Sequence, residues 1–232
     1  MITIRKSEDR GHFDHDWLKT YHTFSFSAYR DEAYMGFRTL RVINEDIVLP
    51  KQGFGRHSHQ DMEIITYPIS GELTHQDSMG NGSTVSSGEI QYMSAGTGVK
   101  HSEFNHSDKE LHLLQIWILP DRRGYTPSYH QQKISEDEKK NRLHLMVSST
   151  GESGSISIHQ DVKIFASTLE PEMKIDYKPE QARHIWLQII RGSLIVNSFS
   201  LEAGDGAAVS DESHLDMLGG KSGVEFLLFD LS

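Results

Sequence analysis

Two short clusters of histidine and acidic residues suggest the chemistry of this chain. The first cluster contains His57 and His59, and the second contains His101 and Glu103. If each cluster lies on a β-strand, its two side chains point to the same face, because side chains alternate along a strand. Two such pairs facing each other would bring three imidazoles and a carboxylate around one point. That arrangement is typical of a metal site.

A second carboxylate competes for the same place. Glu63 follows His59 by four residues, so on an unbroken strand it would share a face with His57 and His59. Glu103 follows His101 by two residues, so it would share a face with His101. Strand parity alone therefore admits either Glu63 or Glu103 as the acidic ligand.

The segments that must position these residues have the pattern of short β-strands. Between residues 53 and 120 the apolar runs MEIITYPI, EIQYM and LHLLQIWIL are separated by glycine-containing turns, and strand patterns resume after residue 143. This spacing is typical of an antiparallel sandwich or barrel. Between these halves the chain is polar and charged, with a helix-start signal at Ser135 and Glu138. We expect an all-β protein with little helix, divided into an N-terminal domain (1–122), a linker with a short helix (123–142) and a C-terminal domain (143–232).

The two halves also resemble each other weakly. Residues 67–73 resemble residues 188–194, and residues 87–94 resemble residues 203–210, in the same order. An internal duplication of a β domain explains this order. The second half contains no clustered histidines, so we expect the metal site in the first half only.

Composition limits the chemistry and the partners. The chain has 232 residues and no cysteine, so a metal would be held by nitrogen and oxygen rather than by thiolate. With 33 acidic against 23 basic residues and no basic cluster, direct binding to nucleic acid is disfavoured. No signal peptide and no apolar run of about 18 residues is present, so we expect a cytoplasmic protein that does not bind a membrane.

Longer motifs identify a resemblance. The pattern H-x-H-x3-E followed by a glycine, and then G-x5-S-x-G followed by a histidine, resembles the two motifs of the cupin superfamily. Ser94 stands where proline is common, and His101 comes two residues late. These departures, with the segments HTFSF, YMGFRTLRVINED, GFGRHSHQDMEIITY, HQDSMGN, YMSAGTGVKHSEFN and LHLLQIWILP, resemble the pirin family, particularly its bacterial members described as quercetinases.

The resemblance implies a fold and a metal site. The fold would be two tandem cupin barrels, the second one degenerate and without metal. One divalent metal ion per chain would be bound, with Fe(II) expected and Mn, Ni, Cu or Zn as alternatives. The ligands implied by the resemblance are His57, His59, His101 and Glu103. Glu63 would then orient an imidazole N–H or hold a proton near the metal.

The resemblance also implies an activity, quercetin 2,3-dioxygenation, in which a flavonol and O2 react and carbon monoxide is released. Glu103 or Glu63 would act as the base. Three residues are candidates for the wall of the substrate cavity. Gln115, a polar residue in an apolar run, either faces the cavity or hydrogen-bonds a neighbour, and the apolar Met93 and Phe54 either line the cavity or pack in the core. The alternative is an iron-dependent, redox-responsive regulatory module that binds a protein partner and has no physiological flavonol turnover.

Overall fold

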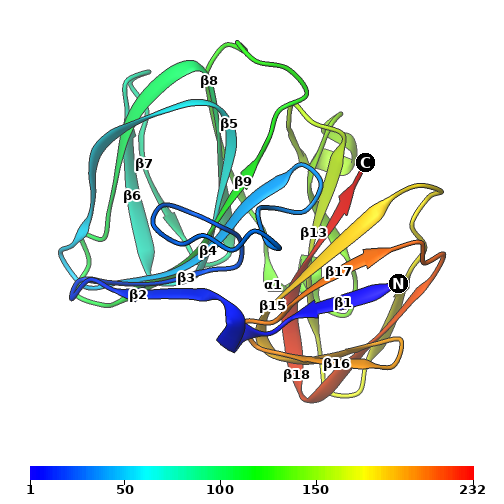
Figure 1. Cartoon of the computed structure of the whole chain (residues 1–232). Coiled ribbons are helices and arrows are strands. Elements are labelled where there is room, and N and C mark those ends of the chain that lie inside the picture. The colour runs from blue at the N-terminus through cyan, green and yellow to red at the C-terminus, as the bar shows by residue number, and fades with distance from the viewer. The chain divides into compact units, whose positions relative to one another are not determined.

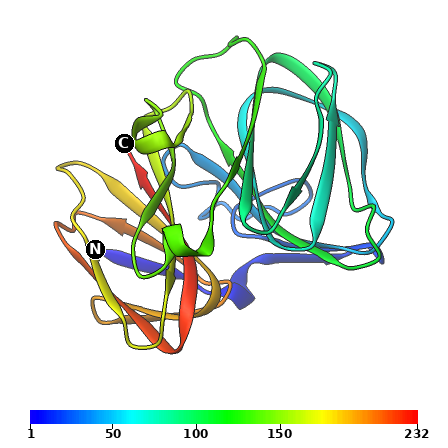
Figure 2. The ribbon, with the colours of Figure 1, turned by 180° about the vertical axis from the view of Figure 1, so that it is seen from behind.

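β-Strands make up most of the computed structural model, which describes all 232 residues (Figures 1 and 2). The helical elements are one α-helix, α1 (Glu136–Lys139), and the 3-10 turns η1 (Ser7–Asp9) and η2 (Glu152–Gly154). Ser135 caps α1 and forms a capping box with Glu138, which confirms the predicted helix start. No helix has the length and apolar character needed to cross a membrane. The expectation of an all-β chain with little helix is confirmed.

The strands form two compact units. The first unit comprises residues 11–134 and 158–160, and the second comprises residues 1–10, 135–157 and 161–232. Each unit is built on one nine-stranded sheet.

The first unit contains both histidine clusters. Along its sheet the strands are β2 (Gly11–Asp14), β3 (Leu18–His22), β4 (Leu40–Val48), β9 (Leu111–Ile118), β5 (Gly53–Ser70), β8 (Glu89–Phe104), β6 (Glu72–Asp77) and β7 (Gly82–Ser86). The remaining strand, β10 (Ser128–Lys133), pairs with β8. All of these pairs are antiparallel. The long strands β5 and β8 therefore lie side by side in the middle of the sheet, with β9 on the other side of β5.

The second unit has a similar build. Its strands follow the order β1 (Ile2–Arg5), β17 (Gly206–Ser210), β15 (His184–Val196), β18 (Leu215–Leu231), β13 (Val162–Leu169), β11 (His144–Ser148) and β12 (Ile156–Ser157). Two further strands pair at the side, β14 (Lys174–Tyr177) with β18 and β16 (Phe199–Glu202) with β15. Its core is formed by buried aliphatic residues and Phe226.

The units differ from the expected domains at two segments. β1 pairs with β17, so the first ten residues belong to the second unit rather than to the N-terminal domain. β10 extends the sheet of the first unit, although its polar sequence SYHQQK reads as part of a linker. No residue of β10 is buried, so this strand needs few apolar side chains.

Equivalent glycines occupy the same backbone conformation in the two repeats seen in the sequence. Gly71 and Gly192 have φ angles of +79° and +71°, and Gly88 and Gly204 have φ angles of +84° and +83°. A Cβ atom at Gly71 would lie 2.6 Å from the carbonyl oxygen of Glu110, so both space and φ require glycine there. The two pairs of similar sequence segments thus contain turns of the same conformation in the two units.

Candidate metal centre

Pairing of β5 with β8 brings the two histidine clusters together. His57 lies directly opposite His101 in the antiparallel register, and His59 lies opposite Val99. Cross-strand partners point to the same face of a sheet. The sequence suggested that these two segments meet, and in the structure they do.

The imidazoles of His57 and His101 converge on one point. Their Nε2 atoms are 3.0 Å apart. Nδ1 of His57 lies 2.8 Å from the carbonyl oxygen of Gly55, to which it donates its proton, so the lone pair of Nε2 points toward His101. Two nitrogens each about 2.1 Å from one ion, and at right angles, would be ~3.0 Å apart. The observed separation therefore fits two ligands of a single metal ion.

His59 completes a group of three imidazoles. Its ring centroid lies 4.7 Å from that of His57 and 4.8 Å from that of His101. The ligand atoms of the three residues all lie within 4.8 Å of one another. Burial lowers the pKa of His59 to about 4 and that of His101 to about 3, with nearby histidines adding to the effect. These two rings are therefore neutral near pH 7, which is the form that binds a metal.

Glu103 adds a buried carboxylate next to His101. Its Oε1 accepts a hydrogen bond from Nε2 of Gln91 (3.3 Å), and its Oε2 accepts one from Nε2 of Gln115 (2.9 Å). Burial raises the pKa of Glu103 to about 7 in the metal-free site, although these hydrogen bonds favour the charged form. A cation nearby would favour the carboxylate. Glu103, His101 and His75 form a second group with ligand atoms within 4.8 Å, and His101 belongs to both groups. Three imidazole nitrogens and one carboxylate, without thiolate, fit a divalent metal ion.

Glu63 does not lie at this site, contrary to the expectation from strand parity. The β5–β8 register shifts between His59 and Asp61, and Asp61 has a φ angle of +65°, so the alternation of β5 changes there. Beyond this point Ile64 packs in the core, and Glu63 faces the other way. We therefore withdraw the role for Glu63 near the metal.

The carboxylate of Glu63 is instead fully buried in a hydrogen-bonded cluster of its own. It accepts hydrogen bonds from the hydroxyl of Tyr92, from the hydroxyl of Ser94 at 2.7 Å and from the backbone N–H of His159 at 3.1 Å. Both carboxylate oxygens thus have donors.

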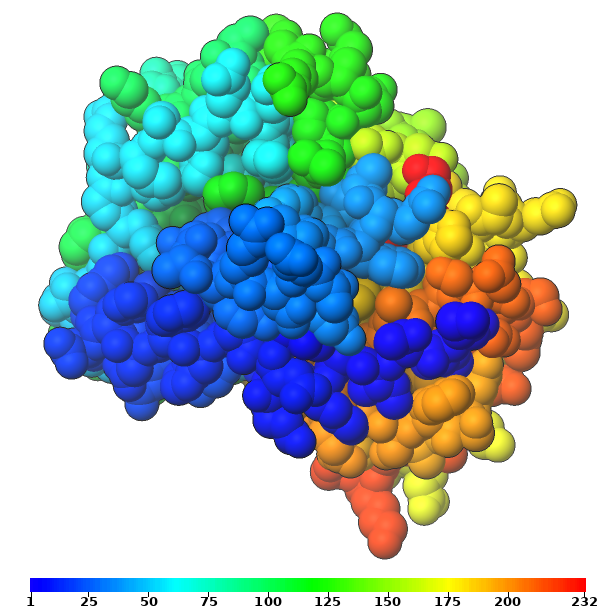
Figure 3. Space-filling view, in the orientation of Figure 1, coloured from blue at the N-terminus to red at the C-terminus, as the bar shows by residue number.

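A cavity of about 450 Å³ opens beside the imidazoles. His57, His59, Glu103 and Gln115 contribute polar groups to its wall. Four aromatic side chains, Trp17, Phe26, Phe54 and Trp117, share the wall with further polar residues such as Asn44 and Asp46. Figure 3 shows the surface of the first unit hollowed between the blue residues of the β3–β4 connection and the cyan residues of β5. The size and lining are those of a small-molecule site.

Of the three candidates for the cavity wall, two line it. Phe54 packs edge-to-face on Trp17, with ring centroids 5.3 Å apart. Gln115 lies in the wall, where its amide holds Glu103. Met93 does not line the cavity: it is fully buried in a core cluster with Ile64 and is a packing residue.

Sequence reasoning missed several polar residues around the site. His75 and Gln91 contact His101 and Glu103, respectively. Gln91 interrupts the apolar run EIQYM as Gln115 interrupts LHLLQIWIL, and this similarity was the available signal. Asp46 also lines the cavity; its Oδ1 atom has no hydrogen-bond partner, and burial raises its pKa to about 7. In the sequence, nothing about Asp46 in the segment of β4 indicates that its carboxyl lines a cavity.

Comparison with known proteins agrees with the fold. The family model Pirin matches residues 3–118, and the model Quercetinase C-terminal cupin domain matches residues 145–231. A protein of Escherichia coli (strain K12) named quercetin 2,3-dioxygenase is 44% identical over 232 residues, which cover 100% of this chain and 99% of the relative. The chain belongs to the pirin family.

Other pirins support this assignment along the whole chain. A pirin-like protein of Caulobacter vibrioides is 35% identical over 214 residues, covering 92% of each chain. The crystal structure of the bacterial pirin YhhW from Escherichia coli in complex with nickel(II) has a TM-score of 0.95 at 42% identity, covering 100% of this chain and 99% of that one. The expected fold of two cupin domains is thereby confirmed. The present chain has a histidine and glutamate site of the kind that holds a metal. Its two groups of candidate ligands, one with His57, His59 and His101 and one with His75, His101 and Glu103, lie in the first unit.

Proposed function

We propose that this pirin is a metal-dependent quercetin 2,3-dioxygenase that opens the heterocyclic ring of a flavonol with O2 and releases carbon monoxide. The observation that carries the proposal is the convergence of His57, His59 and His101 beside a cavity of about 450 Å³ whose wall also contains Glu103. The relative named quercetin 2,3-dioxygenase supports it at 44% identity along the full chain.

The ligand set we propose is His57, His59, His101 and Glu103, with Fe(II) as the working ion. Imidazole and carboxylate ligands suit iron, and open positions on such sites are usual in dioxygen chemistry. Copper and zinc bind nitrogen and oxygen ligands more tightly than iron does, so an ion recovered from purification need not be the working one. The related YhhW structure holds nickel(II), which the same ligand types accept.

When bound, a divalent metal would supply Lewis-acid stabilisation of the negative charge on a flavonol oxygen. The residues of the chain would do the rest. Two edge-to-face aromatic pairs, Trp17 with Phe54 and Phe26 with Trp117, form walls that would hold a flat ring and exclude water. Because Glu103 lines the cavity and Glu63 does not, Glu103 is the carboxyl we propose as acceptor of the flavonol hydroxyl proton.

The two glutamines prepare Glu103 for this task. Gln91 donates to one of its oxygens and Gln115 to the other, so the carboxylate plane is fixed from two strands. The carbonyl oxygen of Gln115 accepts a hydrogen bond from Nε1 of Trp117 (3.2 Å), which orients the amide with its NH2 toward Glu103. Such fixed donors lower the reorganisation needed when charge moves at a site.

Oxygen uptake tests the proposal. Metal-free protein is reconstituted with Fe(II), Mn(II), Ni(II) or Cu(II), and O2 consumption and CO release are followed with quercetin. We expect uptake that needs both the metal and the flavonol, with one CO released per O2 consumed. His57→Ala should abolish it, whereas the matched control His214→Ala, in the second unit, should not. Stoichiometric metal binding without O2 uptake under any of these ions would contradict the proposal.

A further inference from the structure

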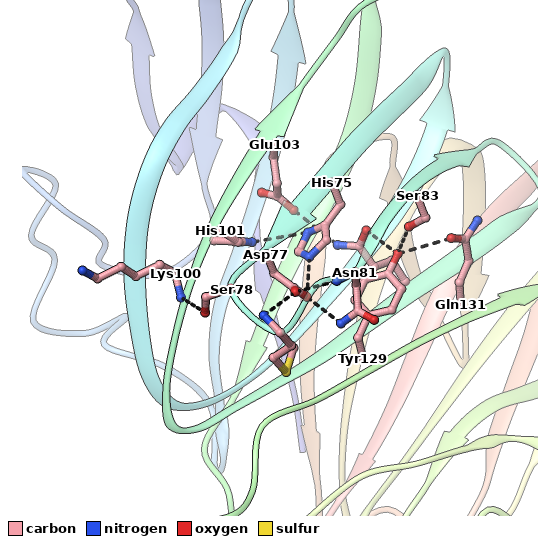
Figure 4. Close-up of polar contacts among 12 residues, drawn as sticks. His75, Asp77, Ser78, Asn81, Ser83, Lys100, His101, Glu103, Tyr129 and Gln131 are labelled. Carbon is pink, nitrogen blue, oxygen red and sulfur yellow. Dashed lines mark hydrogen bonds and ion pairs between the residues drawn. The ribbon is translucent and has the colours of Figure 1, made fainter.

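Behind His101, on the side away from His57, lies a second buried pair, His75 and Asp77. Both side chains are fully buried on β6 and share a face because they are two residues apart. β6 pairs with β8 so that Asp77 lies opposite His101, and His75 lies opposite Glu103. Figure 4 shows His101, His75 and Asp77 in a row, with Glu103 beside them.

The distances define a continuous chain of contacts. Nδ1 of His101 lies 3.4 Å from Nδ1 of His75, and Nε2 of His75 lies 3.2 Å from Oδ2 of Asp77. Asp77 is itself fixed by the backbone N–H groups of Met79 (2.8 Å) and Asn81 (3.0 Å) and by the side-chain amide of Asn81 (2.8 Å). All the donors around Asp77 point at its carboxylate, so toward His75 this residue acts only as a hydrogen-bond acceptor.

Proton placement follows from the two ends. If Nε2 of His101 gives its lone pair to a metal, the proton of that neutral ring is on Nδ1. It can then donate only to a bare Nδ1 of His75. The remaining proton of His75 is therefore on Nε2, where Asp77 accepts it. Only one tautomer of each ring satisfies the whole chain.

We propose that His75 and Asp77 are positioning residues that fix the tautomer and ring orientation of His101 for metal binding. This inference rests on the proposed metal centre and adds a function to two residues outside it. Partners that accept the free N–H of a metal-binding histidine raise its basicity and hold its ring, and losing them typically weakens metal affinity by about 10- to 100-fold. Tyr129 stacks on His75 with ring centroids 4.9 Å apart and limits rotation of that ring.

Variants of His75 provide a matched pair. Asparagine places its carbonyl oxygen near the position of Nδ1 and retains an acceptor for His101, whereas leucine branches at the same atom and is somewhat bulkier but has no acceptor. Asp77→Asn is a third variant: its NH2 group would face Nε2 of His75 and favour the opposite tautomer, which sets Nδ1–H of His75 against Nδ1–H of His101.

The experiment is an anaerobic titration of metal-free protein with Ni(II) or Co(II) against a chelating dye, with visible spectra of the bound ion and thermal unfolding of each metal-free variant. We expect His75→Leu and Asp77→Asn to lower affinity by about 10- to 100-fold and to shift the spectrum, and His75→Asn to stay within about threefold of the wild type. Equal affinity of the leucine variant and the wild type would overturn the proposal. So would equal losses in His75→Asn and His75→Leu, since packing and not the acceptor would then be responsible. If the wild type itself binds no metal, the proposed metal centre fails first.

Discussion

Replacing Glu63 with glutamine tests whether this buried carboxylate is structural or catalytic. An amide oxygen in the place of Oε2 would still accept from Tyr92 and from the backbone N–H of His159. The NH2 group in the place of Oε1 would donate to the Ser94 hydroxyl, which is able to rotate and accept. Each of the three hydrogen bonds then changes from a charged to a neutral acceptor, at about 1 kcal/mol each, and the lower cost of burying a neutral amide offsets most of this, leaving a loss of about 1 kcal/mol.

Glu63→Leu provides the contrast, because it takes the carboxylate from these donors and leaves the two hydroxyls only each other and Nδ1 of His159, 3.5 Å from each of them, as polar neighbours. Two hydroxyls and one backbone N–H would remain buried, at about 1–3 kcal/mol each when unpaired. Since the hydroxyls of Tyr92 and Ser94 would partly pair with each other, we expect a loss of about 4 kcal/mol in the free energy of unfolding. Both values refer to the metal-free protein.

Urea denaturation followed by tryptophan fluorescence measures the stability, because Trp17 and Trp117 report on the first unit. Oxygen uptake with quercetin on metal-loaded protein measures the turnover. We expect Glu63→Gln to keep the turnover number within about threefold of the wild type. A loss of 100-fold or more with unchanged unfolding would refute the structural role, and would mean that Glu63 takes part in proton transfer after all.

Three further outcomes follow from the site. Glu103→Gln removes the only negative charge among the proposed ligands, so metal affinity should fall by at least about tenfold and turnover with it, as a metal titration and oxygen uptake would show. Burial raises the pKa of Asp46 from 3.8 to about 7, so its contribution to stability is present below pH 4 and is lost as pH rises to about 7. Between pH 4 and about 7, the free energy of unfolding of the metal-free wild type should therefore fall by up to about 4 kcal/mol relative to that of Asp46→Asn, as urea denaturation would measure. Relative to the exposed control Asp108→Asn, the wild type should show no such fall. Phe54→Leu removes the ring that packs on Trp17 and should raise the KM for quercetin by about 3- to 10-fold with the metal content unchanged.

The candidate ligand residues could be proposed from the sequence because two of its regularities are strong. Alternation along β5 and β8 places His57 and His59 on one face of their strand, and His101 and Glu103 on one face of theirs. The glycine turns between the strands indicate that the segments are neighbours. Neither inference needs the remainder of the fold. The resemblance to pirins then selected Glu103 over Glu63, which strand parity left open.

The features that the sequence did not indicate depend on local backbone geometry or on long-range pairing. An aspartate in the left-handed region reverses the alternation of β5 at Asp61, and aspartate carries no clear signal for that conformation in a strand. β1 and β17 pair although they lie near opposite ends of the sequence, and β10 has too few apolar residues to be predicted as a strand. The sequence could not decide between cavity and core for Met93, because an apolar residue on a strand gives no indication of which neighbours it will meet; the structure places it in the core.

The metal content of the protein tests the central claim most directly. Metal-free chain is loaded with an excess of Fe(II) without oxygen, freed of unbound ion by gel filtration, and analysed for iron and protein in parallel with His101→Ala. The geometry of the first unit predicts one iron per wild-type chain and essentially none in the variant. A wild type that retains no iron, or a variant that retains as much as the wild type, would contradict a metal centre built on His57, His59, His101 and Glu103.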